Sequence, residues 1–154
     1  MELTKAQIIA EEVKSKLAPF CANIEIAGSI RRKKPYVHDI DLVVIPNNQG
    51  QFIYAVQQLG KIKMGGQKLI RCEMQTIGLD VYIATTDTWA TLLLIRTGSA
   101  RHNVILCTRA RQMGMKLHAD GSGLTKNGDK VAGDTEESIF EALGMKYKKP
   151  EERE

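Results

Sequence analysis

The segment IAGSIRRKKPYVHDIDLVVIP, Ile26–Pro46, carries four consecutive cations and then two carboxylates on either side of one isoleucine. Polar and apolar residues alternate at the start of 39–45, which predicts a strand. In a strand, Asp39 and Asp41 point to one face, and the apolar residues between and after them point into the core. A preceding strand is expected to end at Gly28, because glycine permits a sharp turn.

A second apolar strand repeats this arrangement. Residues 79–83 alternate so that Asp80 lies on the face opposite to its apolar neighbours. If the two strands are neighbours, Asp80 converges with Asp39 and Asp41. Three carboxylates without histidine or cysteine are typical of a Mg²⁺ site, in which the metal keeps waters and accepts phosphate oxygens.

Gly28 and Ser29 supply the complementary half of the expected site. Amides after the glycine and the serine hydroxyl can face an anion, and Arg31 and Arg32 provide forked donors for phosphate oxygens. A triphosphate would then lie between these cations and the carboxylate-held metal, which is the arrangement of two-metal nucleotidyl transfer. Each motif alone is typical of a solvated surface or a turn, but their combination favours a site.

The composition limits the size of the fold and the kinds of partner and location that are expected. A chain of 154 residues with 43% hydrophobic residues can bury the core of one domain or two small lobes, and its net charge of +4 permits a polyanionic partner. No apolar run is long enough to span a membrane, and the start of the chain lacks the pattern of a secretion signal. We therefore expect a cytoplasmic protein that is neither secreted nor membrane-bound. Three scattered cysteines are expected to be buried, reduced thiols.

The order of the expected elements favours an α+β fold. Thr4 and Asp134 are the expected caps of the first and last helices, and Ile8 and Val13 belong to the expected buried face of the first. A soft boundary is placed near Thr86. Helices are expected over 4–17, 51–59, 89–95, 100–113 and 134–143, strands over 24–27, 39–45, 61–64, 68–74 and 79–84, and a hairpin turn at Asn127-Gly128.

Five blocks of the sequence closely resemble the palm and thumb of X-family DNA polymerases, the polymerase-beta-like branch of the nucleotidyltransferases, and most of all the bacterial and archaeal members. The blocks are AGSIRR (27–32), DIDLV (39–43), LDV (79–81), TGSARHN (97–103) and the C-terminal region from VAGDTEE (131–137) to PEERE (150–154). The resemblance implies a nucleotidyltransferase palm over 1–86, a mixed sheet with helices on one face, followed by a small helical and hairpin thumb over 87–154. In extent it is similar to a minimal palm-plus-thumb form.

The resemblance also implies roles for individual residues. Asp39 and Asp41 would hold two Mg²⁺ ions, with Mn²⁺ as an alternative, and Asp80 would bind the catalytic metal and help to take the primer 3′-hydroxyl proton. The implied nucleotide-binding residues are Gly28, Ser29 and Arg32 at the phosphates, Thr97, Gly98 and Ser99 as a cis turn at the sugar, and Asn103 at the base edge.

Several positions depart from the family pattern. His38 stands where relatives usually carry glycine, so its imidazole either replaces the backbone as a phosphate donor or simply faces solvent. Ile95 and Arg96 replace an aromatic pair that screens the sugar, which implies weak sugar discrimination. Arg96 is either a phosphate contact or a surface cation. Cys107 replaces an arginine that reports template alignment, which implies modest fidelity.

Relatives carry helix-hairpin-helix modules that grip DNA, and no such module is expected here. Duplex contacts are therefore assigned to cations of the thumb region, namely Arg101, Arg109, Arg111, Lys116 and Lys126. A small number of phosphate contacts gives weak DNA binding that falls with salt, so we expect distributive synthesis. We expect the protein to be a monomer, and a separate protein is a further candidate for holding the DNA.

The function expected from the sequence is that of a repair-type DNA-directed DNA polymerase, which adds deoxynucleotides to a primer 3′-hydroxyl at nicks or short gaps. Its expected partners are a primer-template or gapped DNA duplex and a deoxynucleoside triphosphate. Two alternatives stay open: a template-independent or small-substrate nucleotidyltransferase, and a catalytically silent nucleic-acid-binding module.

Overall fold

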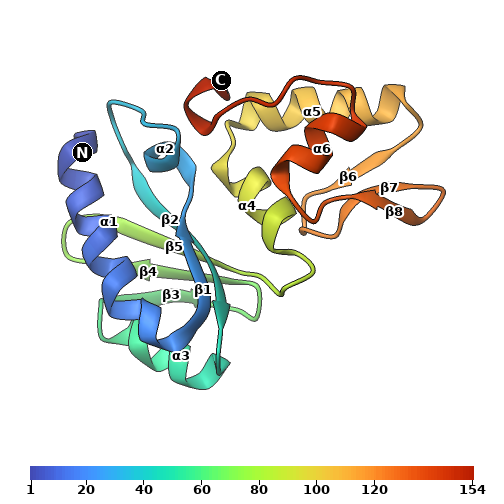
Figure 1. Ribbon diagram of the computed structural model, residues 1–154. Coiled ribbons are helices and arrows are strands. Elements are labelled where there is room, and N and C mark those ends of the chain that lie inside the picture. The colour runs from blue at the N-terminus through green and yellow to red at the C-terminus, as the bar shows by residue number, and fades with distance from the viewer.

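Alternating apolar residues in the first half of the chain build one mixed sheet with strand order β1-β2-β5-β4-β3. The computed structural model describes residues 1–154. The strands are β1 (Cys21–Ile26), β2 (Asp39–Pro46), β3 (Lys61–Gly65), β4 (Leu69–Glu73) and β5 (Gly78–Ile83). Only β2 and β5 pair in parallel, and the other three pairs are antiparallel. Figure 1 shows this sheet in one lobe and the later helices in a second.

Two helices, α1 (Leu3–Leu17) and α3 (Gln49–Gln57), cover one face of this sheet. The buried side of α1 consists of Ala6, Ala10, Val13 and Leu17, spaced at three or four residues. The prediction that Ile8 belongs to the buried face is wrong, because its side chain is 66% exposed.

The expected cap of α1 is also wrong. Glu2, not Thr4, is the N-cap residue, and it makes no side-chain capping bond. Contacts with a distant segment fix this start, since Glu2 forms an isolated bridge with Tyr36 and the N-terminal amine donates a hydrogen bond to the carbonyl of Val37 at 3.0 Å. Tertiary pairing therefore replaces local capping here.

Part of the opposite face of the sheet is covered by α4 (Trp89–Thr97). Leu92 and Leu93 of this helix pack against Val43 of β2 and Ala84 after β5. The following residues of the same helix, beginning with Leu94, enter the core of the second lobe. The helix thus belongs to both cores, and the expected boundary near Thr86 falls in the connection that precedes it.

The second lobe contains α5 (Ala100–Gln112), a three-stranded sheet and α6 (Glu136–Ala142). The sheet consists of β6 (Lys116–His118), β7 (Gly123–Lys126) and β8 (Asp129–Ala132), all antiparallel. The predicted hairpin at Asn127-Gly128 is confirmed, and both residues have positive φ, as a tight two-residue turn requires. Strand β6 adds a third strand to the expected hairpin.

The predicted cap of α6 is displaced by one residue. Thr135 is the N-cap and forms a reciprocal capping box with Ser138, whereas Asp134 accepts a hydrogen bond from Lys130 at 2.8 Å. Short helical segments η1 (Ala18–Phe20) and η2 (Pro150–Glu152) complete the chain.

The three cysteines are free, but only Cys72 is buried; Cys21 and Cys107 are partly exposed, so the burial prediction is wrong for these two. None of the helices combines the length and apolar character needed to cross a membrane.

Candidate active site

The register between β2 and β5 places Asp41 directly opposite Asp80, and Asp39 opposite Gly78. The alternate residues Ile40 and Leu79 are buried in the core below the sheet. All three carboxylates therefore project from the face that α1 and α3 leave uncovered. The neighbouring strands expected from the sequence are thus side by side, with Asp80 next to Asp41.

Two glycines leave room for these carboxylates. A Cβ atom on Gly28 would lie 2.1 Å from Oδ2 of Asp41, and one on Gly78 would lie 2.5 Å from Oδ1 of Asp39. Gly28 also has a φ of +61°, which favours glycine over residues with a side chain. A side chain at either position would therefore displace the carboxylate that it faces.

The carboxylates raise one another's proton affinity. Burial first, and then the charges of Asp80 and Asp39, raise the pKa of Asp41 to about 7, although Arg96 and Arg32 oppose the shift. Burial likewise raises the pKa of Asp80. This concentration of negative charge is what a bound cation would relieve.

The donor set fits a hard divalent cation. All donors are carboxylate oxygens, and the glycines provide space beside two of them. As the side chains stand, no three acidic, histidine or cysteine groups are close enough to hold an ion. Oδ1 of Asp80 lies 3.4 Å from Nε of Arg71 on β4, so Asp80 is paired with a cation while Asp39 and Asp41 are not.

A cavity of about 340 Å³ lies beside the carboxylates, at the meeting of the two lobes. Asp39 and Asp41 line it, whereas Asp80 does not. Of the residues predicted to bind nucleotide, all but Ser99 line this cavity: Gly28, Ser29, Arg32, His38, Thr97, Gly98 and Asn103. Residues from both halves of the sequence are therefore brought to one place.

Arg32 is the cavity's most distinctive cation. Its Nη1 donates a 2.6 Å hydrogen bond to the carbonyl of Thr97, while its buried Nε has no hydrogen-bond partner. Such a donor is costly unless a ligand or water satisfies it. His38 is exposed, and its ring lies edge-on to Tyr36 at 5.2 Å, so it is free to turn toward an anion.

The turn between α4 and α5 forms another wall. The peptide bond Gly98-Ser99 is cis, as the family resemblance implied, and the Ser99 hydroxyl accepts a hydrogen bond from the amide of His102 at the start of α5. Asn103 donates through Nδ2 to the carbonyl of Ile95 at 2.8 Å, and its buried Oδ1 has no partner. One hydrogen of the Asn103 amide is therefore engaged, and its oxygen has no partner within the protein.

Arg31 does not have the role that the sequence suggested. Its guanidinium makes two hydrogen bonds to Glu136, at 2.7 and 2.8 Å, and a third to the hydroxyl of Thr97. Arg153, which has no exposed surface, donates to the same carboxylate at 3.0 Å. Burial alone would raise the pKa of Glu136, but the hydrogen bonds from Arg31 and Arg153 outweigh it and lower the pKa.

The buried network of Arg31, Glu136 and Arg153 was not predicted from the sequence, because its members are distant in the chain. Arg31 and Glu136 are 105 residues apart, and no local pattern links them. The network connects α2 (Gly28–Arg31) with α6, so Arg31 holds the two lobes together and is not available to a phosphate.

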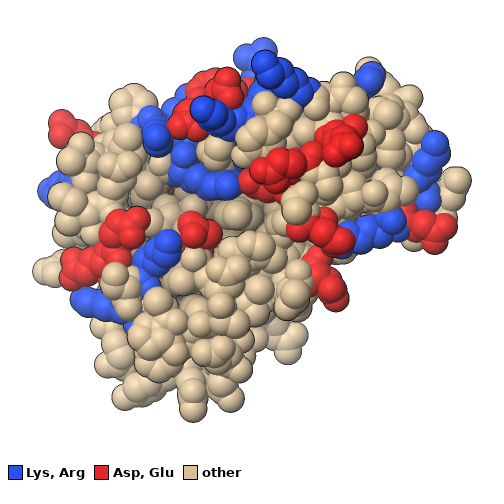
Figure 2. Space-filling model, viewed as in Figure 1, with Lys and Arg blue, Asp and Glu red and all other residues tan.

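Four of the five cations assigned to DNA are exposed and form neither ion pairs nor side-chain hydrogen bonds: Arg101, Arg111, Lys116 and Lys126. Arg109 differs, because its Nε donates to the carbonyl of Leu143 at 3.0 Å. Figure 2 shows basic and acidic side chains mixed along the boundary between the lobes, so the visible surface is neither uniformly positive nor uniformly negative.

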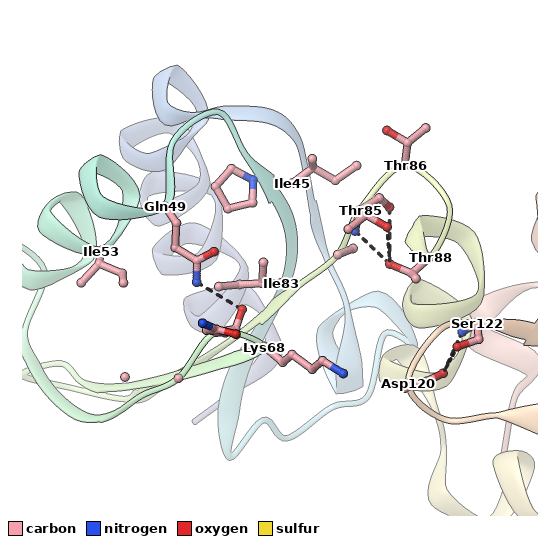
Figure 3. Close-up of a pocket in the computed structure, with 15 residues that line it drawn as sticks. Ile45, Gln49, Ile53, Lys68, Ile83, Thr85, Thr86, Thr88, Asp120 and Ser122 are labelled. Carbon is pink, nitrogen blue, oxygen red and sulfur yellow. Dashed lines mark hydrogen bonds between the residues drawn. The ribbon is translucent and has the colours of Figure 1, made fainter.

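A larger hollow, of about 900 Å³, lies near the other ends of β2 and β5 (Figure 3). Polar groups from both lobes line it, but they bond to one another: Thr85 to Thr88, and Asp120 to Ser122. The smaller cavity is lined by Asp39, Asp41 and Arg32, whose Nε has no partner, so we regard it as the candidate active site.

Comparison with known proteins relates the chain to DNA polymerases. The family model described as "DNA polymerase beta thumb" matches residues 92–154. The curated protein "DNA polymerase/3'-5' exonuclease PolX" of Bacillus subtilis (strain 168) is 26% identical over 155 residues, which cover 95% of this chain. In these comparisons the chain is similar to DNA polymerases of the polymerase beta and PolX kinds.

A solved structure agrees on the fold. A polymerase beta from Leishmania infantum, solved as a ternary P/T complex, matches with a TM-score of 0.86 at 20% identity, over 100% of this chain and 76% of its own. The chain described here spans 27% of the length of the Bacillus relative.

Proposed function

We propose that this protein is a DNA-directed DNA polymerase that adds deoxynucleotides to a primer 3′-hydroxyl at nicks or short gaps. The observation that carries the proposal is the pairing of Asp41 with Asp80 across β2 and β5, beside a cavity in which Arg32 has an unpartnered buried nitrogen. Asp39 and Asp41 line this cavity together with Arg32, and carboxylates and a cation around one cavity suit a metal-bound triphosphate.

In this proposal Asp39 and Asp41 hold two Mg²⁺ ions and Asp80 holds one of them. The bound ions would supply charge neutralisation at the phosphates and activation of the attacking hydroxyl. Asp80 is assigned the proton of the primer hydroxyl, and burial raises the pKa of this carboxyl. One oxygen of Asp80 pairs with Arg71, and its other oxygen would be available to the ion.

The phosphates of the nucleotide are assigned to Arg32 and Ser29, which line the cavity beside Asp41. Arg32 lines the cavity and Thr97 fixes its Nη1, so little side-chain freedom is lost on binding. The nucleotide sugar is assigned to the Thr97–Ser99 turn, and the base edge to Oδ1 of Asn103.

DNA and a deoxynucleoside triphosphate are the proposed partners. The names of the relatives support a polymerase, and the exposed, unpaired Arg101, Arg111, Lys116 and Lys126 support contacts with DNA phosphates. A small number of such contacts predicts binding that weakens steeply with salt, and therefore distributive synthesis in short-gap repair.

Primer extension on a one-nucleotide gap tests this function. The wild-type chain is expected to add the nucleotide complementary to the template. The same is expected of Asp129→Ala, which changes an exposed aspartate of β8 that does not line the cavity. Asp41→Ala should lose roughly 100-fold or more of the rate. Equal rates in Asp41→Ala would refute the assigned chemistry, and addition independent of the template base would indicate a template-independent transferase.

A further inference from the structure

Arg96 is an exposed arginine in the last turn of α4, and its guanidinium carbon lies 4.2 Å from the centroid of the Tyr82 ring. Tyr82 follows Asp80 by two residues on β5, so its ring projects from the same face of the sheet as the carboxylates. A cation over an aromatic face is attracted to it. The flexible Arg96 side chain is therefore held at a defined place in the candidate site.

The position of Arg96 matters because of what shares its cavity. Arg96 and Tyr82 line the 340 Å³ cavity together with Asp39 and Asp41. Neither of these two carboxylates forms an ion pair, and Arg96 forms no ion pair or hydrogen bond either. Asp80 differs, because Arg71 is its partner at 3.4 Å on the far side of β5.

The other cations of the region are already engaged. Arg31 is bound to Glu136, and Arg32 donates to the carbonyl of Thr97. Arg96 is thus the cavity's guanidinium without a hydrogen-bonded partner, and the Tyr82 ring fixes it without neutralising its charge. An aromatic platform leaves the full positive charge available to the carboxylates across the cavity.

We propose that Arg96 is a positioning residue that serves as a resident counter-charge for Asp39 and Asp41, and that it weakens divalent-cation binding to the nucleotide-free site. The inference rests on the proposed function, because it takes these carboxylates to bind a divalent cation. A guanidinium and a dication compete for the same negative charge, since like charges in one cavity repel. The negative triphosphate offsets Arg96, so metal binding becomes coupled to nucleotide binding.

Mn²⁺ titration of the nucleotide-free full chain tests this, by calorimetry and by the electron paramagnetic resonance signal of free Mn²⁺. Arg96→Gln removes the charge and should tighten Mn²⁺ binding by about threefold to tenfold. Arg96→Lys keeps the charge and should stay within about twofold of wild type. Lys5→Gln, an exposed cation of α1 on the covered face of the sheet, gives the same change in net charge and should leave affinity unchanged.

A second variant tests the role of the Tyr82 ring that holds Arg96. Tyr82→Leu frees Arg96 and should tighten Mn²⁺ binding in the same direction but less, and its unfolding midpoint reports whether the fold is intact. Unchanged or weaker Mn²⁺ affinity in Arg96→Gln overturns the counter-charge role. If the wild-type chain extends primers while Arg96→Gln binds Mn²⁺ equally, only this inference fails. If no variant binds Mn²⁺ and none extends a primer, the proposed function fails with it.

Discussion

Arg31 and Glu136 are joined by two parallel hydrogen bonds of 2.7 and 2.8 Å that connect the glycine-serine turn of the first lobe to α6 of the second. Arg153 from the C-terminal segment shares the same carboxylate. One buried anion therefore holds three segments, and the wall of the candidate site formed by Arg32 and Thr97 depends on their arrangement.

Removal of this anion should be strongly destabilising. Glu136→Ala leaves Arg153 buried without a counter-charge, which should lower the free energy of unfolding by about 3–5 kcal/mol in urea denaturation. Glu12→Ala, which breaks the exposed pair with Lys16, should change it by no more than about 0.5 kcal/mol. A similar small effect in both variants would contradict a structural role for the network.

His102 should make the stability depend on pH. Both ring nitrogens are buried without partners, and burial first, then Arg153 and Lys148, lower the pKa of His102 to about 4. The unfolded chain therefore binds more protons between about pH 6.5 and pH 4, so this contribution to stability is lost as the pH falls through that window, by roughly 2–3 kcal/mol.

Urea unfolding at both ends of this window checks the prediction. His102→Phe, which keeps an aromatic group beside Phe140, should flatten the pH dependence. His118→Gln, at a partly exposed histidine of β6, should retain it. A wild-type slope in His102→Phe would assign the effect to other groups.

Asp41 should make the stability depend on pH in the sense opposite to His102. Burial and the neighbouring carboxylates raise its pKa to about 7, so its contribution is present at low pH and is lost as the pH rises through about 7. At about pH 8 with a chelator, Asp41→Asn should be more stable than wild type by about 1–3 kcal/mol, because it removes a buried, repelled charge.

Addition of Mg²⁺ should make the wild-type chain more stable than Asp41→Asn, because the ion stabilises the chain that binds it. Thermal unfolding with chelator and with excess Mg²⁺ measures both effects, and Asp129→Asn serves as the exposed control. Stabilisation of Asp41→Asn by Mg²⁺ equal to that of wild type would argue against a metal site at Asp41.

Gly28 and Gly128 form a matched pair for testing the glycine beside Asp41. Both have positive φ, but a Cβ on Gly28 would lie 2.1 Å from Asp41, whereas nothing lies within 4 Å of one on Gly128. Each substitution to alanine should cost about 1 kcal/mol through backbone strain. Only Gly28→Ala should also displace the carboxylate, with a further loss of stability, Mg²⁺ binding and primer extension. Equal losses in both variants would remove the proposed steric role of Gly28.

The sequence by itself determined the features that depend on neighbouring residues. Alternation in β2 and β5 fixed which face Asp41 and Asp80 occupy, since side chains of a strand alternate sides whatever lies around it. The Asn127-Gly128 hairpin followed for a similar reason, because its positive φ angles are set by residue type.

Only the tertiary structure decided which distant groups meet. It made Glu2 the start of α1, gave Arg31 to Glu136 instead of to a phosphate, and laid Arg96 over Tyr82. Ion pairing and burial depend on distances between segments that are far apart in the chain, and these distances exist only once the two lobes have packed together.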